Sequence, residues 1–95
     1  MASPKARVHV VISGLVQGVF FRHYTRKYAI QYNLTGWVKN RPDGNVEAIF
    51  EGDELNIGLM IDWCRGGPPH AHVSHIDISH EKPTNTFPDF RIIYE

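Results

Sequence analysis

The sequence predicts an α+β fold in which two helices cover one face of a mainly antiparallel sheet of four to five strands. Segments with alternating apolar and polar residues, typical of half-buried strands, are separated by two segments whose apolar residues recur every three or four positions, as in amphipathic helices. The resulting order is strand, helix, strand, strand, helix, strand and a short fifth strand, the split β-α-β arrangement. The chain of 95 residues shows no linker, repeat or low-complexity tract, so we expect a single domain over residues 1–95, with its core at about 7–94.

The first strand and the first helix follow from local periodicity. Val8, Val10 and Ile12 alternate with polar residues, which predicts a strand with one buried face. A helix is predicted from Phe21 to about Asn33, because its apolar residues form one stripe at helical spacing. That stripe consists of Phe21, Tyr24, Thr25, Tyr28, Ala29 and Tyr32.

A hairpin is predicted next. Residues 35–41 form its first arm, and residues 42–45, with the sequence Pro42-Asp43-Gly44-Asn45, give a strong turn signal. Val46, Ala48 and Phe50 alternate with other residues along the return arm.

The second helix is predicted from Glu54 to about Arg65. Asp53 is its expected N-cap, and the run Gly66-Gly67-Pro68-Pro69 ends it. We expect the buried face of this helix to contain Leu55, Leu59, Met60 and Trp63, with Cys64 beside them.

The last third of the chain returns to strand patterns. Residues 73–81 alternate with Ile76 and Ile78 on one face, residues 83–88 form a loop, and residues 90–94 form a short final strand. Its pairing partner does not follow from the pattern.

Composition excludes several classes of protein. The 10 Lys and Arg residues balance the 10 Asp and Glu residues, so no general attraction to nucleic acid or to an anionic membrane is expected. Cys64 is the only cysteine, which excludes an internal disulfide and a multi-cysteine metal site. The N-terminus lacks the apolar run of a signal peptide and no segment is long enough to span a membrane, so a cytoplasmic protein is expected. We separately expect a monomer.

The turn between the first strand and the first helix has the features of an anion site. Gly14 and Gly18 allow positive φ and close approach of the backbone to a ligand, and the first N–H groups of a helix have no partner inside it. The first helical turn carries Arg22 instead of the acidic residues that the helix dipole favours. A bound anion would supply the missing negative charge, although a simply solvated Arg22 fits the position equally well.

Topology brings Asn40 to the same place. Because a helix connects the first and second strands, they run parallel in direction, and a right-handed crossover puts both C-terminal ends at one edge of the sheet. Arg22 follows the first of these ends and Asn40 marks the second. Together with the amides of residues 17–21, they could hold a phosphoryl group and orient a water for in-line attack. Alternatively, Asn40 is a strand-end residue that bonds the neighbouring turn.

At this point two motifs resemble the signatures of the acylphosphatase family. The first reads Gly14-Leu15-Val16-Gln17-Gly18-Val19-Phe20-Phe21-Arg22. The second begins Gly36-Trp37-Val38-Lys39-Asn40-Arg41-Pro42-Asp43-Gly44-Asn45-Val46-Glu47 and continues to Gly52. Gly67-Pro68-Pro69, Ala71, Val73 and the ending Phe90-Arg91-Ile92 also match in place, so the similarity extends from about Arg7 to Tyr94.

The resemblance implies a ferredoxin-like fold and a small enzyme, without metal or other cofactor, that hydrolyses acyl phosphates to a carboxylate and inorganic phosphate. It implies that Arg22 and the loop amides bind the phosphate and that Asn40 orients the attacking water. The expected phosphate-binding residues are Gln17, Gly18, Val19, Phe20, Phe21 and Arg22, and the expected catalytic residues are Arg22 and Asn40. The expected partner is a small acyl phosphate.

Two other functions fit the same fold. Split β-α-β sheets also bind RNA or regulatory ligands, but the predicted strands lack paired aromatic and basic residues on an open face. Service within a larger machine that handles carbamoyl phosphate is disfavoured by the free-standing length and the absence of zinc-finger cysteines.

The remaining candidate residues favour structural roles. We interpret Phe21 and Trp37 as core residues and Cys64 as a buried structural thiol, and the resemblance assigns no role to His23. Four further histidines are interpreted as solvated, because a common metal-ligand geometry is not visible in them. They are His70, His72, His75 and His80.

Overall fold

The computed structural model describes residues 4–94 and shows two helices and five strands. Residues 1–3 and 95 lie outside the described residues. They belong to the expected domain over residues 1–95, and residues 1–3 are also part of the N-terminus in which no signal peptide is expected. The elements are β1 (Lys5–Leu15), α1 (Phe21–Gln31), β2 (Thr35–Asn40), β3 (Val46–Asp53), α2 (Glu54–Gly66), β4 (His72–Glu81) and β5 (Phe90–Ile93). The predicted element order is confirmed, with bounds shifted by only one or two residues.

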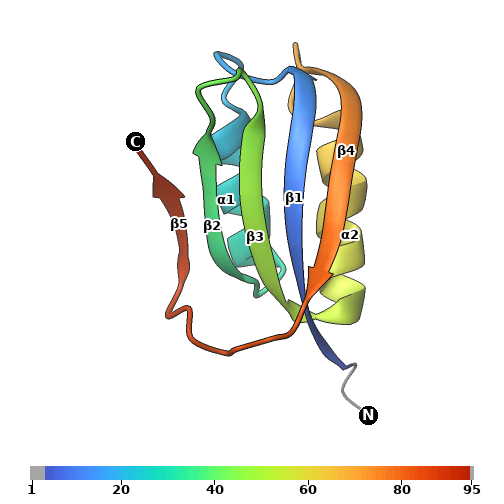
Figure 1. Ribbon diagram of the computed structural model, residues 1–95, viewed down its shortest axis with the longest axis vertical. Helices are drawn as coiled ribbons and strands as arrows, with labels where there is room; N and C mark the ends of the chain where they lie inside the picture. Colours follow the sequence, from blue (N-terminus) through green and yellow to red (C-terminus); the bar gives the residue numbers. More distant parts are fainter. Residues whose placement is uncertain (1–3, 95) are drawn as a thin grey trace.

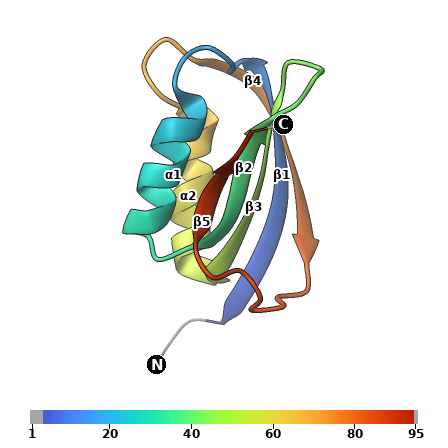
Figure 2. The ribbon, with the colours of Figure 1, turned by 90° about the vertical axis from the view of Figure 1, so that its left-hand side faces the viewer.

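The five strands form one sheet in the order β4-β1-β3-β2-β5 (Figure 1). β3 runs antiparallel to both β1 and β2, which makes β1 and β2 parallel in direction, as the crossover rule predicts. β5 adds to the edge of β2 in parallel, with Val38 opposite Ile92. Both helices lie on one face of the sheet (Figure 2). The fold is therefore the predicted α+β arrangement, with the C-terminal ends of β1, β2 and β5 at one edge.

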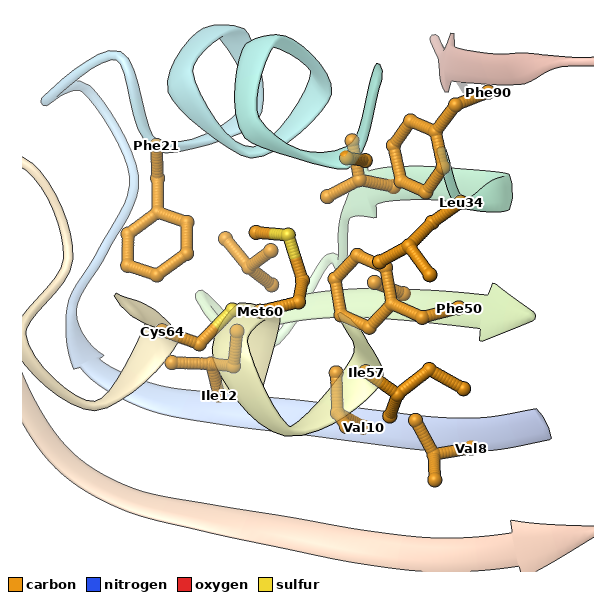
Figure 3. Close-up of a cluster of buried hydrophobic side chains, with 14 of the residues drawn as sticks. Val8, Val10, Ile12, Phe21, Leu34, Phe50, Ile57, Met60, Cys64 and Phe90 are labelled. Atoms are coloured by element: carbon orange, nitrogen blue, oxygen red, sulfur yellow. The ribbon is translucent and has the colours of Figure 1, made fainter. Parts of the chain in front are cut away.

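The core lies between the sheet and the two helices (Figure 3). Val8, Val10 and Ile12 of β1 point into it, as their alternation predicts. Phe50 and Phe90 stack with ring centres 5.6 Å apart, which fixes β5 against the core. The other buried side chains that the core contains are Val16, Phe21, Ala29, Leu34, Val38, Val46, Ala48, Ile57, Met60 and Cys64.

The predicted buried face of α2 is partly wrong. Met60 and Cys64 are buried, and Trp63 packs at the edge of the core, but Leu55 is 74% exposed and Leu59 is 48% exposed. The residue that was missed is Ile57, which is 3% exposed. Spacings of three and seven residues place Ile57, Met60 and Cys64 on one helical stripe, and Leu55 and Leu59 lie outside it.

Two smaller predictions also need correction. Asp53 occupies the N-cap position of α2, but its side chain makes no capping bond and instead pairs with Lys5 at 2.7 Å. The Glu54 N–H donates to the carbonyl oxygen of Pro4 at 2.9 Å, so the N-terminal segment caps this helix. Trp37 is half-buried and is not among the residues of the core. Since Val38 points toward the helices, strand alternation turns Trp37 to the opposite face.

The loop between β4 and β5 is held by a buried carboxylate. Glu51 is only 4% exposed, and its two carboxylate oxygens accept the backbone N–H groups of Thr84 at 2.7 Å and Asn85 at 3.1 Å. Arg7 adds a second tie, because it donates to Glu81 and to the Thr84 hydroxyl. These contacts position the segment that leads into β5.

Replacing Glu51 by alanine is expected to lower the free energy of unfolding by about 2–3 kcal/mol, because two loop N–H groups lose a charged acceptor. Urea unfolding measures the change. The control is Glu54→Ala at an exposed position, where a loss below about 1 kcal/mol is expected. A Glu51→Ala midpoint equal to that of the wild type would contradict the structural role of this carboxylate.

No helix within residues 4–94 is long and apolar enough to cross a membrane.

Candidate active site

The turn from β1 into α1 adopts the backbone conformations that the glycine pattern predicts. Gly14 has φ +125° and Gly18 has φ +76°, both in the region that favours glycine. A Cβ atom on Gly14 would lie 2.1 Å from the carbonyl oxygen of His72, so β4 approaches the bare backbone there. Phe20, the residue before α1, is also left-handed at φ +64°. The turn is therefore tightly wound immediately before the helix begins.

The backbone N–H groups of this turn have the features of an anion-binding site. The first bond across the start of α1 runs from the Tyr24 N–H to the Phe20 carbonyl at 3.1 Å. Among the described residues, none of the N–H groups of residues 18–23 donates within the protein. The first turn of α1 contains no acidic residue and no capping side chain. Free amides and the positive end of the helix dipole together favour a bound anion.

Gln17 fixes the turn beside the β2–β3 hairpin. Its side-chain amide donates to the carbonyl oxygens of Arg41 at 2.8 Å and Asn45 at 2.9 Å. The side chain is therefore used for positioning, which leaves only the backbone amide of Gln17 for the phosphate-binding role that we predicted. These two hydrogen bonds also explain how the glycine turn stays next to the end of β2.

Arg22 and Asn40 line the same pocket, of about 300 Å³, at the shared edge of β1 and β2. Within residues 4–94, Arg22 has no carboxylate partner, and its guanidinium carbon lies 5.1 Å from the centre of the Tyr94 ring. Arg22 is half-buried, so it is held against an aromatic ring instead of being freely solvated. Of the predicted phosphate-binding residues, Gly18, Phe20, Phe21 and Arg22 line this pocket, whereas Gln17 and Val19 do not.

The side-chain oxygen Oδ1 of Asn40 is buried and has no hydrogen-bond partner within residues 4–94. The backbone of Asn40 pairs with Val46 in the β2–β3 ladder, but its side chain makes no bond to the neighbouring turn. A buried acceptor without a partner costs free energy, so its presence at the edge of a pocket calls for a donor from outside the protein. Water is one molecule that could provide such a donor.

The other candidate residues contribute little to this pocket. His23 lines it and lies edge-on to Tyr24, with ring centres 5.3 Å apart. No group of three His, Cys, Asp or Glu side chains in the described part of the chain is placed to hold a metal ion. The four histidines considered as ligands are all exposed, and His75 pairs with Asp77 at 3.0 Å. Burial raises the pKa of the Cys64 thiol far above its usual range, so Cys64 is no nucleophile.

Sequence reasoning missed the contribution of β5 to the pocket. Ile92 and Tyr94 line it together with Arg22 and Asn40. A short alternating segment predicts β5, but no local signal predicts that it pairs with β2 and ends beside Arg22. Only the parallel register, with Val38 opposite Ile92, brings Tyr94 to this edge.

The family model for acylphosphatase matches residues 8–92 of this chain. The chain belongs to the acylphosphatase family. An acylphosphatase from Syntrophus aciditrophicus is 54% identical over 89 residues, which cover 94% of this chain and 93% of that protein. The match includes both motifs and runs from within β1 to within β5, so the family membership predicted from the two motifs is confirmed.

Solved acylphosphatase structures share the ferredoxin-like fold of this chain. The structure from Coxiella burnetii has a TM-score of 0.89 and 40% sequence identity, and covers 94% of this chain and 93% of its own. The structure from Bacillus subtilis has a TM-score of 0.90 and 32% identity, and covers 94% and 99%. This member of the family is therefore an enzyme that hydrolyses small acyl phosphates, and the pocket beside Arg22 and Asn40 is the candidate for its active site.

Proposed function

We propose that Arg22 and the backbone amides of residues 18–22 bind the phosphoryl group of an acyl phosphate and that Asn40 orients the water that attacks it. The observation that carries this proposal is what lies at one pocket: a guanidinium without a carboxylate partner within residues 4–94, and a buried amide oxygen of Asn40 without a partner there. Beside them is a turn whose N–H groups donate to no carbonyl among the described residues. The guanidinium and the N–H groups bind anions, and the amide oxygen accepts a hydrogen bond from water.

The division of roles follows from charge. Arg22 carries a positive charge, and its planar fork of donors fits two phosphate oxygens. Asn40 is neutral, so it tolerates a nearby phosphoryl group that would repel a carboxylate. Its Oδ1 accepts an O–H of the water, which leaves a lone pair of the water oxygen free to face phosphorus.

The reaction then needs little covalent help from the protein. The water oxygen forms a bond to phosphorus while the bond between phosphorus and the bridging oxygen breaks, and the acyl group leaves as a carboxylate with the bonding electron pair. The attacking water releases a proton to phosphate or solvent. A carboxylate is a stable leaving group that needs no general acid, so positioning and charge stabilisation carry the catalysis.

A substrate panel tests this mechanism. In the presence of a chelator, the enzyme is expected to hydrolyse acetyl phosphate but to hydrolyse a simple alkyl phosphate monoester more than about a thousandfold more slowly, because an alkoxide is a far poorer leaving group. Released phosphate is the readout for both substrates. Comparable rates on the two substrates, or loss of acetyl phosphate turnover on chelation, would contradict a site built only from Arg22, amides and Asn40.

A further inference from the structure

Position 20 carries a side chain that neither its backbone nor the core explains. Its φ of +64° suits glycine or asparagine, and a bulky residue there is an outlier. Phe20 is nevertheless 74% exposed and does not pack against the core. Its ring makes no aromatic pair among the described residues. A phenyl ring in such a place is costly for folding, which indicates a role in binding.

Tyr94 is a second exposed aromatic residue at the same pocket. Its side chain is 75% exposed, and its ring contacts the Arg22 guanidinium. Phe20 and Tyr94 both line the pocket that contains Arg22 and Asn40. Ile92, which is half-buried, adds a third apolar side chain to the pocket lining. The pocket therefore has a cationic, amide-rich part beside apolar walls.

An acyl phosphate has the same two-part character. Its phosphoryl group is anionic, and its acyl carbon is only one bridging oxygen away from phosphorus. If the phosphoryl group sits at Arg22, the acyl group starts within the same pocket, which the Tyr94 ring also lines and where that ring lies 5.1 Å from the guanidinium carbon. An acetyl group ends in one methyl and offers little surface to such walls, whereas an aromatic ring or a longer apolar chain offers much more.

We propose that Phe20 and Tyr94 form an acyl-group subsite that makes this enzyme prefer acyl phosphates with aromatic or extended apolar acyl groups over acetyl phosphate. The proposal rests on the phosphoryl position given under the proposed function. It assigns to the side chain of Phe20 a role separate from the phosphate contact of its backbone amide.

The test is the ratio of kcat/KM for benzoyl phosphate to kcat/KM for acetyl phosphate. Phe20→Asn keeps a residue that tolerates the left-handed conformation and removes the ring, and Tyr94→Ser removes the second wall. Each is expected to lower the ratio by about three- to tenfold, the range for the loss of one aromatic contact. Phe20→Tyr keeps the ring and is expected to restore the wild-type ratio.

Leu55→Asn is the matched control, because Leu55 has the same exposed fraction of 74% on α2 and does not line the pocket. It should leave the ratio unchanged. Ratios within about twofold of the wild type in both Phe20→Asn and Tyr94→Ser would overturn the proposal.

A binding measurement covers the case in which a variant turns over too slowly. Benzoylphosphonate and acetylphosphonate have a carbon–phosphorus bond in place of the scissile bond, so calorimetry gives their affinities directly. The wild type should bind the benzoyl compound more tightly, and Phe20→Asn should reduce that advantage; an advantage that is absent in the wild type or unchanged in the variant would overturn the subsite. Failure of the proposed function is separate, because it would appear as full turnover in Arg22→Ala whatever the ratio.

Discussion

Replacing Arg22 by alanine is expected to lower kcat/KM for acetyl phosphate by at least about a thousandfold, the scale seen when an arginine that stabilises a transferred phosphoryl group is lost. The half-buried guanidinium has no carboxylate partner within residues 4–94, so its charge is available to substrate. Arg22→Lys keeps the charge without the planar fork and is expected to recover only part of the loss. The measurement is steady-state release of phosphate.

Arg26 provides the control for this substitution. It lies one turn further along α1, is exposed and does not line the pocket. Arg26→Ala makes the same change in net charge, so it should leave kcat/KM within about twofold of the wild type if the effect of Arg22 is local. Equal losses in the two variants would show that only the general charge of the helix matters.

Replacing Asn40 by alanine is expected to lower kcat for acetyl phosphate by about a hundredfold or more, because the attacking water loses the acceptor that orients it. The melting temperature should not fall, since Asn40 Oδ1 makes no hydrogen bond inside the described structure. This pairing of lost activity with retained stability separates a role in catalysis from the alternative, a strand-end residue that bonds its turn. Thermal unfolding and turnover on the same preparation measure both.

Asn56→Ala is a matched control on α2, outside the pocket, and should retain full activity. Asn40→Asp is a sharper variant, because it keeps the shape of the side chain and adds a negative charge beside the phosphoryl group. It should be no more active than Asn40→Ala. High activity in Asn40→Asp would indicate a base at this position and would exclude orientation by a neutral amide.

Local signals predicted most of this fold. The alternation of Val8, Val10 and Ile12 identified β1, and the turn at residues 42–45 identified the hairpin, since both depend on neighbouring residues. The buried face of α2 was harder to predict, because Leu55 and Leu59 are as apolar as Ile57 and only packing of α2 against the sheet selects Ile57. The pairing of β5 with β2 depends on a contact between residues far apart in sequence, which no local pattern specifies.

The candidate site divides in the same way. The meeting of the glycine turn, Arg22 and Asn40 was predictable, since a glycine turn before a helix and a basic residue in the first turn are local features, and the crossover rule placed Asn40 beside them. The place of Tyr94 was not predictable, because it directly follows β5 and depends on the pairing of β5 with β2. The side-chain bonds of Gln17 to the hairpin were missed because a glutamine carries no sign in the sequence of which carbonyl groups it will meet.

Binding of inorganic phosphate tests the central claim most directly, because phosphate should occupy the proposed phosphoryl site at Arg22 and the turn amides without being hydrolysed. Calorimetric titration of the wild type, Arg22→Ala and Asn40→Ala would compare the two halves of the site. Phosphate affinity is predicted to fall by at least about tenfold in Arg22→Ala, because charged hydrogen bonds to the phosphate are lost. It should stay within about twofold of the wild type in Asn40→Ala, because that variant loses only the acceptor for the attacking water. Equal phosphate affinity in the wild type and Arg22→Ala would contradict the account.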